Sequence, residues 1–186
     1  ALYALGPQEG LWVSHDQGGE WAPVQGLQPF QALTDIVVGD ALLVASQGGG
    51  ILRGVDGTWA QVCDANDVQS LLSIQGTQEA WAGTAEGQLL RSQDGGETWE
   101  SVASPCEGQP VLSLVASPTY AQDHTLLMGT AIAATGSRDA RVALWRSTNG
   151  GEDWRQLTAQ TTDARWLDIA VPEDDPEAIN HVVMVT

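Results

Sequence analysis

A short segment that ends in tryptophan recurs along the 186-residue chain, and it restricts the possible folds more than any other feature. The copies occupy residues 11–21, 51–59, 89–99 and 144–154, and the second copy is shortened. Their final tryptophans are separated by 38, 40 and 55 residues. Periods of about 20 to 50 residues indicate repeat architectures such as solenoids and propellers. The chain is therefore expected to form one repeat array over residues 1–186.

Each interval has room for about four short strands. Apolar stretches bounded by turn residues predict strands at 68–74, 79–83, 88–92 and 98–102. The same frame predicts strands at 33–38, 41–46, 50–54 and 58–62, and then at 110–117 and 125–130. The connections are short enough for antiparallel hairpins. Four meandering strands per repeat are typical of a β-propeller blade, so we predict an all-β propeller with blades that end near Trp21, Trp59, Trp99 and Trp154.

The copies follow the pattern Ser-x-Asp-x-Gly-x-Thr-Trp, which resembles the BNR or Asp-box repeat of sialidases, sortilin-type receptors, xyloglucanases and photosystem assembly factors. The third copy matches throughout, the first has Glu20 in place of Thr, the fourth has Asn149 and Asp153, and the second is degenerate. Serine and aspartate side chains can bond nearby backbone amides, and glycine permits positive φ. The tryptophan is expected to pack over the turn. The predicted structural residues are Ser14, Asp16, Gly18, Trp21, Asp56, Trp59, Ser92, Asp94, Gly96, Trp99, Ser147, Asn149, Gly151 and Trp154.

In the families that the chain resembles, Asp boxes lie at the blade periphery, away from the central axis. The resemblance therefore implies a structural role for these acids and not catalysis or calcium binding. Their spacing also departs from the EF-hand calcium-loop pattern. The three histidines are scattered, with no metal-ligand spacing, and no phosphate-binding glycine loop precedes a helix. We expect no metal and no cofactor.

The charge balance restricts the partners. Seven arginines, no lysine and 24 acidic residues give a formal net charge of −17. Nucleic acid should be repelled, which leaves proteins or carbohydrates as partners. No run of 18 apolar residues predicts membrane insertion. Photosystem assembly factors bind through basic patches that this acidic chain does not show.

An active site is not apparent. A sialidase needs three arginines, an activated tyrosine and an acid, and the usual Arg-Ile-Pro signature is absent. Tyr3 and Tyr120 are the only tyrosines, and Tyr120 is expected in a loop between strands. A glycoside hydrolase needs two carboxylates across a cleft. Its candidates are Asp35, Asp64, Asp67, Asp123, Asp168 and residues 173–175, each also explained as a turn or solvated loop.

The predicted blades do not close a ring. The chain is expected to hold about four and a half blades, with an incomplete last blade at 165–186, so a second chain or a missing segment should complete the ring. The first residue is not Met, which indicates processing or truncation. Whether Cys63 and Cys106 form a bridge is left open.

The leading hypothesis is a non-catalytic scaffold or binding domain for a protein or glycan partner, working outside the cytoplasm. The alternative is a fragment of a secreted glycoside hydrolase with a propeller fold. Trp81 and Trp166 lie outside the repeated segments and distinguish the two: tryptophans that line a cleft favour sugar binding, and tryptophans buried between blades oppose it. The longest interval contains an insertion at 131–141, where a binding surface could form.

Overall fold

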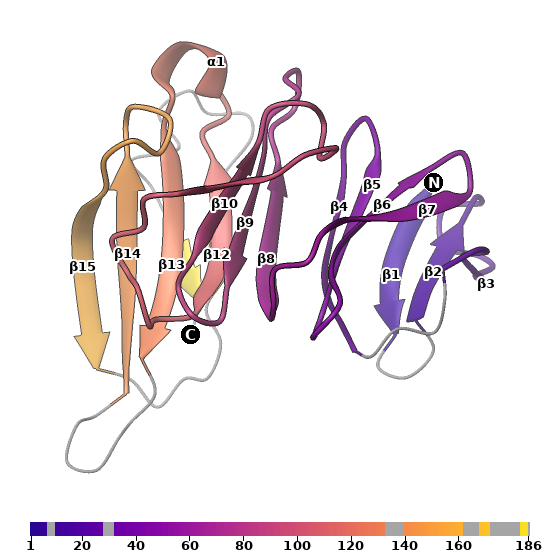
Figure 1. The fold of residues 1–186 in the computed structure, drawn as a ribbon, viewed down its shortest axis with the longest axis horizontal. Helices are drawn as coiled ribbons and strands as arrows, with labels where there is room; N and C mark the ends of the chain where they lie inside the picture. The colour runs from indigo at the N-terminus through magenta and orange to yellow at the C-terminus, as the bar shows by residue number, and fades with distance from the viewer. Residues whose placement is uncertain (7–9, 28–31, 133–139, 162–167, 172–182, 186) are drawn as a thin grey trace.

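The computed structural model describes residues 1–6, 10–27, 32–132, 140–161, 168–171 and 183–185. Within these residues the chain forms antiparallel sheets in which each strand pairs with its neighbour in the sequence. Figure 1 shows the sheets standing side by side in chain order, from indigo to orange. The single described helix, α1 (Tyr120–Asp123), is one turn long and lies between two strands. The predicted all-β class is confirmed.

Each described sheet is made of strands that are consecutive in the sequence. The first contains β1 (Leu2–Gly6), β2 (Gly10–Ser14) and β3 (Ala22–Pro23). The second contains β4 (Leu33–Val38), β5 (Leu42–Ser46), β6 (Gly50–Val55) and β7 (Thr58–Cys63). The third contains β8 (Val68–Ser73), β9 (Ala80–Thr84), β10 (Leu89–Ser92) and β11 (Glu100–Val102). The fourth contains β12 (Val111–Ala116), β13 (Leu126–Ile132), β14 (Arg141–Ser147) and β15 (Arg155–Thr161). A pair, β16 (Asp168–Ala170) and β17 (Val183–Val185), follows.

The predicted strand boundaries differ from these mainly at the fourth strands. The prediction began one strand at Thr98, but β11 begins at Glu100 because Thr98 and Trp99 still belong to the turn. The expected loop around Tyr120 contains α1. Residues 133–139 of the insertion predicted at 131–141, Trp166 and the acidic run 173–177 lie outside the described residues. The ends of that predicted insertion, residues 131–132 and Arg141, belong to strands β13 and β14.

The first strands of adjacent sheets are joined by side-chain hydrogen bonds. The Thr34 hydroxyl donates to the Val68 carbonyl (2.6 Å), and the Ser70 hydroxyl donates to the Val111 carbonyl (3.0 Å). Both donors lie at or beside a β-bulge in the first strand of their sheet. A bulge interrupts the ladder and re-aims side chains. Each bond contributes about 0.5–1.5 kcal/mol and fixes one sheet on the next.

Apolar clusters fill the spaces between the sheets. The second and third sheets share a cluster that includes Leu43, Ile51, Val68 and Leu90. The third and fourth sheets share a larger one, built around Trp81, Leu89, Val111, Leu126 and Met128. Fully burying a side chain of this size contributes about 1.5–3 kcal/mol, so these faces hold the sheets together.

The two cysteines lie at different depths. Cys106 is buried in the cluster between the third and fourth sheets, and Cys63 is half-buried at the end of β7. Both are free thiols, so the bridge that the sequence left open does not form.

Glycines let the turns before the final strands of the third and fourth sheets lie flat on the preceding sheet. Gly96 has φ +82°, and a Cβ built there would stand 2.6 Å from Leu43 Cδ2, a side chain of the second sheet. A Cβ at Gly151 would overlap the Trp81 ring in the same way. No side chain larger than hydrogen fits at these two contacts without displacing a buried neighbour.

We predict that Gly96→Ala lowers the free energy of unfolding by about 1–3 kcal/mol through overpacking, in addition to the cost of its left-handed backbone. Gly76→Ala is the matched control because Gly76 has φ +76° and a Cβ there would meet nothing within 4 Å. Urea denaturation of both variants separates packing from backbone strain. Equal losses in the two variants would contradict the close contact with Leu43.

Candidate functional site

Three turns of identical geometry precede the last strands of the first, third and fourth sheets. We call residues 14–21, 92–99 and 147–154 the repeat turns. In the third sheet, the Ser92 hydroxyl accepts from the Gly96 amide (2.9 Å) and donates to Asp94 Oδ1 (2.8 Å). The same oxygen of Asp94 accepts from the Thr98 amide (2.9 Å). Ser14 with Asp16 and Ser147 with Asn149 repeat these bonds within about 0.1 Å.

The tryptophans that end the turns differ in their packing. The Trp99 indole donates to the Gly96 carbonyl (3.2 Å) and the Trp154 indole to the Gly151 carbonyl (3.1 Å), so both rings lie over their own turns. Trp21 is 41% exposed.

The second copy of the motif does not form this turn. Val55 pairs with Thr58, and the two residues between them, Asp56 and Gly57, have φ of 49° and 77°. Two positive φ values are typical of a type I′ hairpin. Trp59 reaches away from its own turn and donates to the Gln25 carbonyl (3.2 Å). Assigning Asp56 and Trp59 the same role as the other copies was therefore wrong, because the shortened turn leaves no amide for Asp56 to brace.

The turn acids are held ionised by donated hydrogen bonds. The hydroxyl and amide of Thr98 lower the pKa of Asp94 to about 2, with a smaller contribution from Ser92. The Glu20 amide and the Ser14 hydroxyl lower the pKa of Asp16. These bonds favour the charged form, so the acids are poor proton donors.

The third and fourth sheets meet at a half-buried carboxylate. One oxygen of Glu79, Oε1, accepts from Trp81 Nε1 (2.9 Å), Arg91 Nε (2.9 Å) and the Tyr120 hydroxyl (3.0 Å). The Arg91 guanidinium also lies 5.4 Å from the Trp81 ring centroid, a cation–π contact. Tyr120 comes from α1, so the cluster ties two sheets together. Burial, and then the charge of Glu79, raise the pKa of Tyr120 well above its usual value.

An open cavity of about 700 Å³ lies beside this carboxylate. Its charged and aromatic walls come from Glu79 and Arg91 of the third sheet, Tyr120 and His124 around α1, and Glu152 of the fourth repeat turn. Thr77, Asn149 and Gly150 complete the polar rim. The His124 carbonyl accepts from the Gly150 amide (2.9 Å), which joins α1 to the repeat turn. This bond fixes two parts of the cavity rim to each other.

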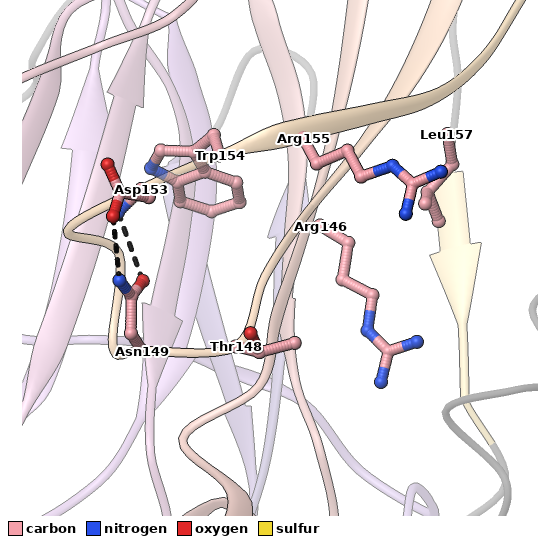
Figure 2. A pocket seen from close by; sticks show the side chains of 7 residues that line it. All are labelled: Arg146, Thr148, Asn149, Asp153, Trp154, Arg155 and Leu157. Atoms are coloured by element: carbon pink, nitrogen blue, oxygen red, sulfur yellow. Dashed lines mark hydrogen bonds between the residues drawn. The ribbon is translucent and has the colours of Figure 1, made fainter.

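A second hollow of about 470 Å³ lies on the other side of the fourth repeat turn, beside Trp154 (Figure 2). Arg146, Arg155 and Leu157 line it with the turn residues. Figure 2 shows Asn149 and Asp153 joined by two bonds, with the Arg155 guanidinium next to Leu157 and the Arg146 guanidinium below it in the view. The Nε of Arg146 is buried and has no hydrogen-bond partner among the described residues.

A family model of the DUF6242 beta propeller domain matches residues 1–173. The chain belongs to this family. No curated protein matches the DUF6242 chain. The predicted propeller fold and the likeness to propellers with BNR-type repeats are confirmed.

Solved structures of other propellers are similar to this DUF6242 domain. The GH74 xyloglucanase from Xanthomonas campestris has a TM-score of 0.69 and 19% identity, over 97% of this chain and 32% of that one. YCF48 from Cyanidioschyzon merolae has a TM-score of 0.59 and 17% identity, over 87% of this chain and 57% of that one. YCF48 bound to D1 peptide has a TM-score of 0.57 and 17% identity, over 83% and 52%. The chain thus spans about a third of the first relative and just over half of the others, and the likeness at these identities shows the fold alone.

Two of the acids considered for hydrolysis, Asp35 and Asp123, accept hydrogen bonds from backbone amides. Asp35 accepts from the amides of Ile36 and Leu71 (both 2.7 Å). Asp123 accepts from the Ser117 hydroxyl (2.6 Å) and from the Thr125 amide (2.8 Å), which lower its pKa against the effect of burial. The side chain of Asp168 and residues 173–175 lie outside the described part of the chain.

Among the described residues, no three His, Cys, Asp or Glu side chains are grouped as a metal site would require. No described helix is long and apolar enough to cross a membrane.

Glu79 is the residue that the sequence analysis missed, since it was assigned only to a strand. The sequence signal that could have identified it is a residue type that departs from the other repeats at the equivalent position. The repeated arginines Arg53, Arg91 and Arg146 pair in the same register with Leu43, Trp81 and Leu127. The residues two places before these three partners therefore occupy equivalent positions in the repeats. These are Ala41, Glu79 and Thr125. A carboxylate where the other repeats have a small side chain indicates a special contact, but its partner Tyr120 lies 41 residues away.

We predict that Asp94→Asn flattens the pH dependence of stability between about pH 4 and pH 2. The folded pKa of Asp94, about 2, is below the ordinary aspartate value of 3.8, so its stabilisation is present above pH 4 and is lost as the pH falls through the folded pKa. An asparagine keeps one acceptor oxygen but does not titrate. Chemical denaturation at several pH values measures the slope.

The reverse substitution in the fourth repeat turn, Asn149→Asp, should change the pH dependence of stability in the opposite direction. Asn149 Nδ2 donates to Asp153 Oδ2 (3.1 Å), so Asn149→Asp places two carboxylates together. That variant should be less stable at neutral pH and recover as the acids become protonated. Parallel slopes in the two variants would contradict the role assigned to the turn acids.

Proposed function

We propose that this DUF6242 domain is a non-catalytic scaffold that binds a protein or glycan partner, and that the cavity beside Glu79 is its binding site. The proposal is carried by one observation: Glu79 Oε1 already accepts three hydrogen bonds, from Trp81, Arg91 and Tyr120. A carboxylate oxygen occupied in this way is engaged in contacts within the protein, so it is not free to exchange a proton with a substrate. The raised pKa of Tyr120 opposes a role as a phenolate nucleophile.

The burial of Trp81 opposes a sugar cleft at this position. Its side chain is 1% exposed, and the Gly151 backbone lies against its ring. It therefore offers no platform for a sugar ring. Trp166, the other tryptophan that would distinguish the two functions, lies outside the described residues.

The charge of the domain supports a partner with basic groups. With a net charge of −17, a cationic protein surface would be attracted at long range. A protein of the same fold, YCF48, has been solved with a bound peptide. Action outside the cytoplasm remains part of this proposal.

The glycoside hydrolase alternative has one observation in its favour, since Glu79 and Glu152 both line the cavity. We predict that xyloglucan incubated with the domain releases no reducing ends. Release that is abolished in Glu79→Gln would support the hydrolase and contradict our proposal.

The binding site is tested with a glycan array and a peptide array, probed with the same labelled domain. We predict that the combined change His124→Ala and Glu152→Ala weakens the strongest array signal by about tenfold, because both side chains line the cavity. Glu20→Ala is the control, since Glu20 lies at the first repeat turn and outside the cavity. A signal that survives the double change, or no signal on either array, would contradict the proposed site.

We also propose that an adjoining chain completes the ring beside Arg146. Arg53, its counterpart in the second sheet, donates to the Gly95 carbonyl of the next repeat turn (3.0 Å) and pairs with Glu97 (3.3 Å). The unused Nε of Arg146 and the 45% exposed Leu157 support a similar turn docking there.

We predict that the 186-residue chain associates in sedimentation velocity and that Arg146→Glu weakens this association by about tenfold, because it reverses the charge at the docking point. Arg141→Glu makes the same charge change at an exposed residue outside the hollow and should have little effect. A chain that stays monomeric at high concentration would contradict completion by a second copy.

A further inference from the structure

The repeat turns of the third and fourth sheets each cover part of the sheet before them. The turn at Gly95 and Gly96 lies on Leu43 and accepts a hydrogen bond from Arg53. The turn at Gly151 lies on Trp81. At both junctions a glycine backbone therefore fills the same position against a side chain of the preceding sheet.

The junction between the first and second sheets has the same register but lacks the turn. Tyr3 pairs with Val13 as Leu43 pairs with Arg53. By this register, the turn of the second sheet should lie on Tyr3. That turn is the short hairpin at Asp56 and Gly57 instead, which is two residues shorter than a repeat turn.

A groove of about 430 Å³ lies between these two sheets. Tyr3, Val13 and His15 of the first sheet line it, with Leu42, Gly54 and Trp59 of the second. Residues 22–25 and the hairpin at 56–57 complete the walls. The groove thus occupies the junction where a repeat turn would otherwise pack.

Trp59 is held as a wall of the groove. A Cβ at Gly54 would stand 2.8 Å from the Trp59 ring, so the ring lies directly on that glycine. Its Nε1 donates to the Gln25 carbonyl of the first sheet (3.2 Å), which ties the ring across the junction. Gly54 takes the place of Ser14, Ser92 and Ser147, and a serine there would meet the ring.

The chemistry of the groove favours one kind of occupant. The walls are largely apolar, and Val13 replaces the arginine that the other three repeats have at this register. Asp56 is the acidic group of the lining, on a chain of net charge −17. A cationic segment is attracted to such a site, whereas the acidic repeat turns of a second copy are repelled.

We propose that this groove binds a tight turn of a partner protein, with a small apolar or glycine tip and basic flanking residues. The chain itself shows that a glycine turn fits against the residue that corresponds to Tyr3. The site is separate from the cavity beside Glu79, and it does not depend on the function proposed for that cavity.

The test uses the whole chain and a labelled cyclic peptide in which two arginines flank a leucine–glycine–glycine–leucine turn. An otherwise identical peptide with glutamates in place of the arginines is the charge control. We expect the basic peptide to bind at least about tenfold more tightly than the acidic one in fluorescence anisotropy, with a difference that shrinks as salt is added. Hydrogen exchange should show protection at residues 22–25 and 54–59.

Two changes to the chain should weaken or abolish binding. Val13→Arg introduces the residue of the other repeats and repels the peptide, so we expect binding to weaken at least about tenfold. Val38→Arg is the matched control, because Val38 is 59% exposed and outside the groove. Replacing residues 54–58 with a copy of segment 92–98 should fill the groove with a full repeat turn, with circular dichroism checking that the variant folds.

The proposal is overturned if Val13→Arg and Val38→Arg weaken binding equally, or if neither peptide binds. It is also overturned if a xyloglucan oligosaccharide, and not the basic peptide, protects residues 22–25 and 54–59. The change His124→Ala with Glu152→Ala should leave peptide binding intact, which separates failure here from failure of the cavity.

Discussion

The packing of the third and fourth sheets against their neighbours depends on a serine hydroxyl at the end of β10 and β14. It accepts the amide hydrogen of a glycine four residues later and donates to the acid or amide between them. This exchange satisfies backbone groups that a tight turn would otherwise leave unpaired. It also fixes the glycine at a positive φ, with its bare backbone facing the preceding sheet. The apolar clusters can then close with a backbone contact at their outer end.

The turn of the following sheet closes the junctions between the second and third sheets and between the third and fourth, so changes in a turn alter the surface at a junction. A complete turn beside Trp81 leaves a polar cavity, whose carboxylate, guanidinium and phenol hold one another. The shortened turn at Asp56 and Gly57 leaves an apolar groove. The side chain at the repeat position of Arg53 then sets the charge of the junction. An arginine there can reach a carbonyl of the next turn, whereas a valine cannot. One scaffold thus presents surfaces of different chemistry through small changes at equivalent positions.

The failures of sequence reasoning have a common physical cause. Asp56 matches the acid of the motif in sequence, but a hairpin of two residues offers it no amide to brace. Glu79 has no motif around it, and its importance comes from Tyr120 and Arg91, which only the docking of α1 and β10 brings to one oxygen. Tyr120 itself was expected in a loop, although a helical turn buries it. Pairs separated by 41 residues leave no local pattern.

The sequence by itself determined the sheets, their order and the three serine-braced turns. These features depend on hydrogen bonds and alternation within about ten residues, so they repeat visibly whenever the residues repeat. Only the tertiary structure decided which junctions are filled and which are open, and whether Trp81 faces solvent or a neighbour. Those outcomes depend on contacts between sheets, where the presence of one glycine backbone or the loss of two residues determines what packs and what remains exposed.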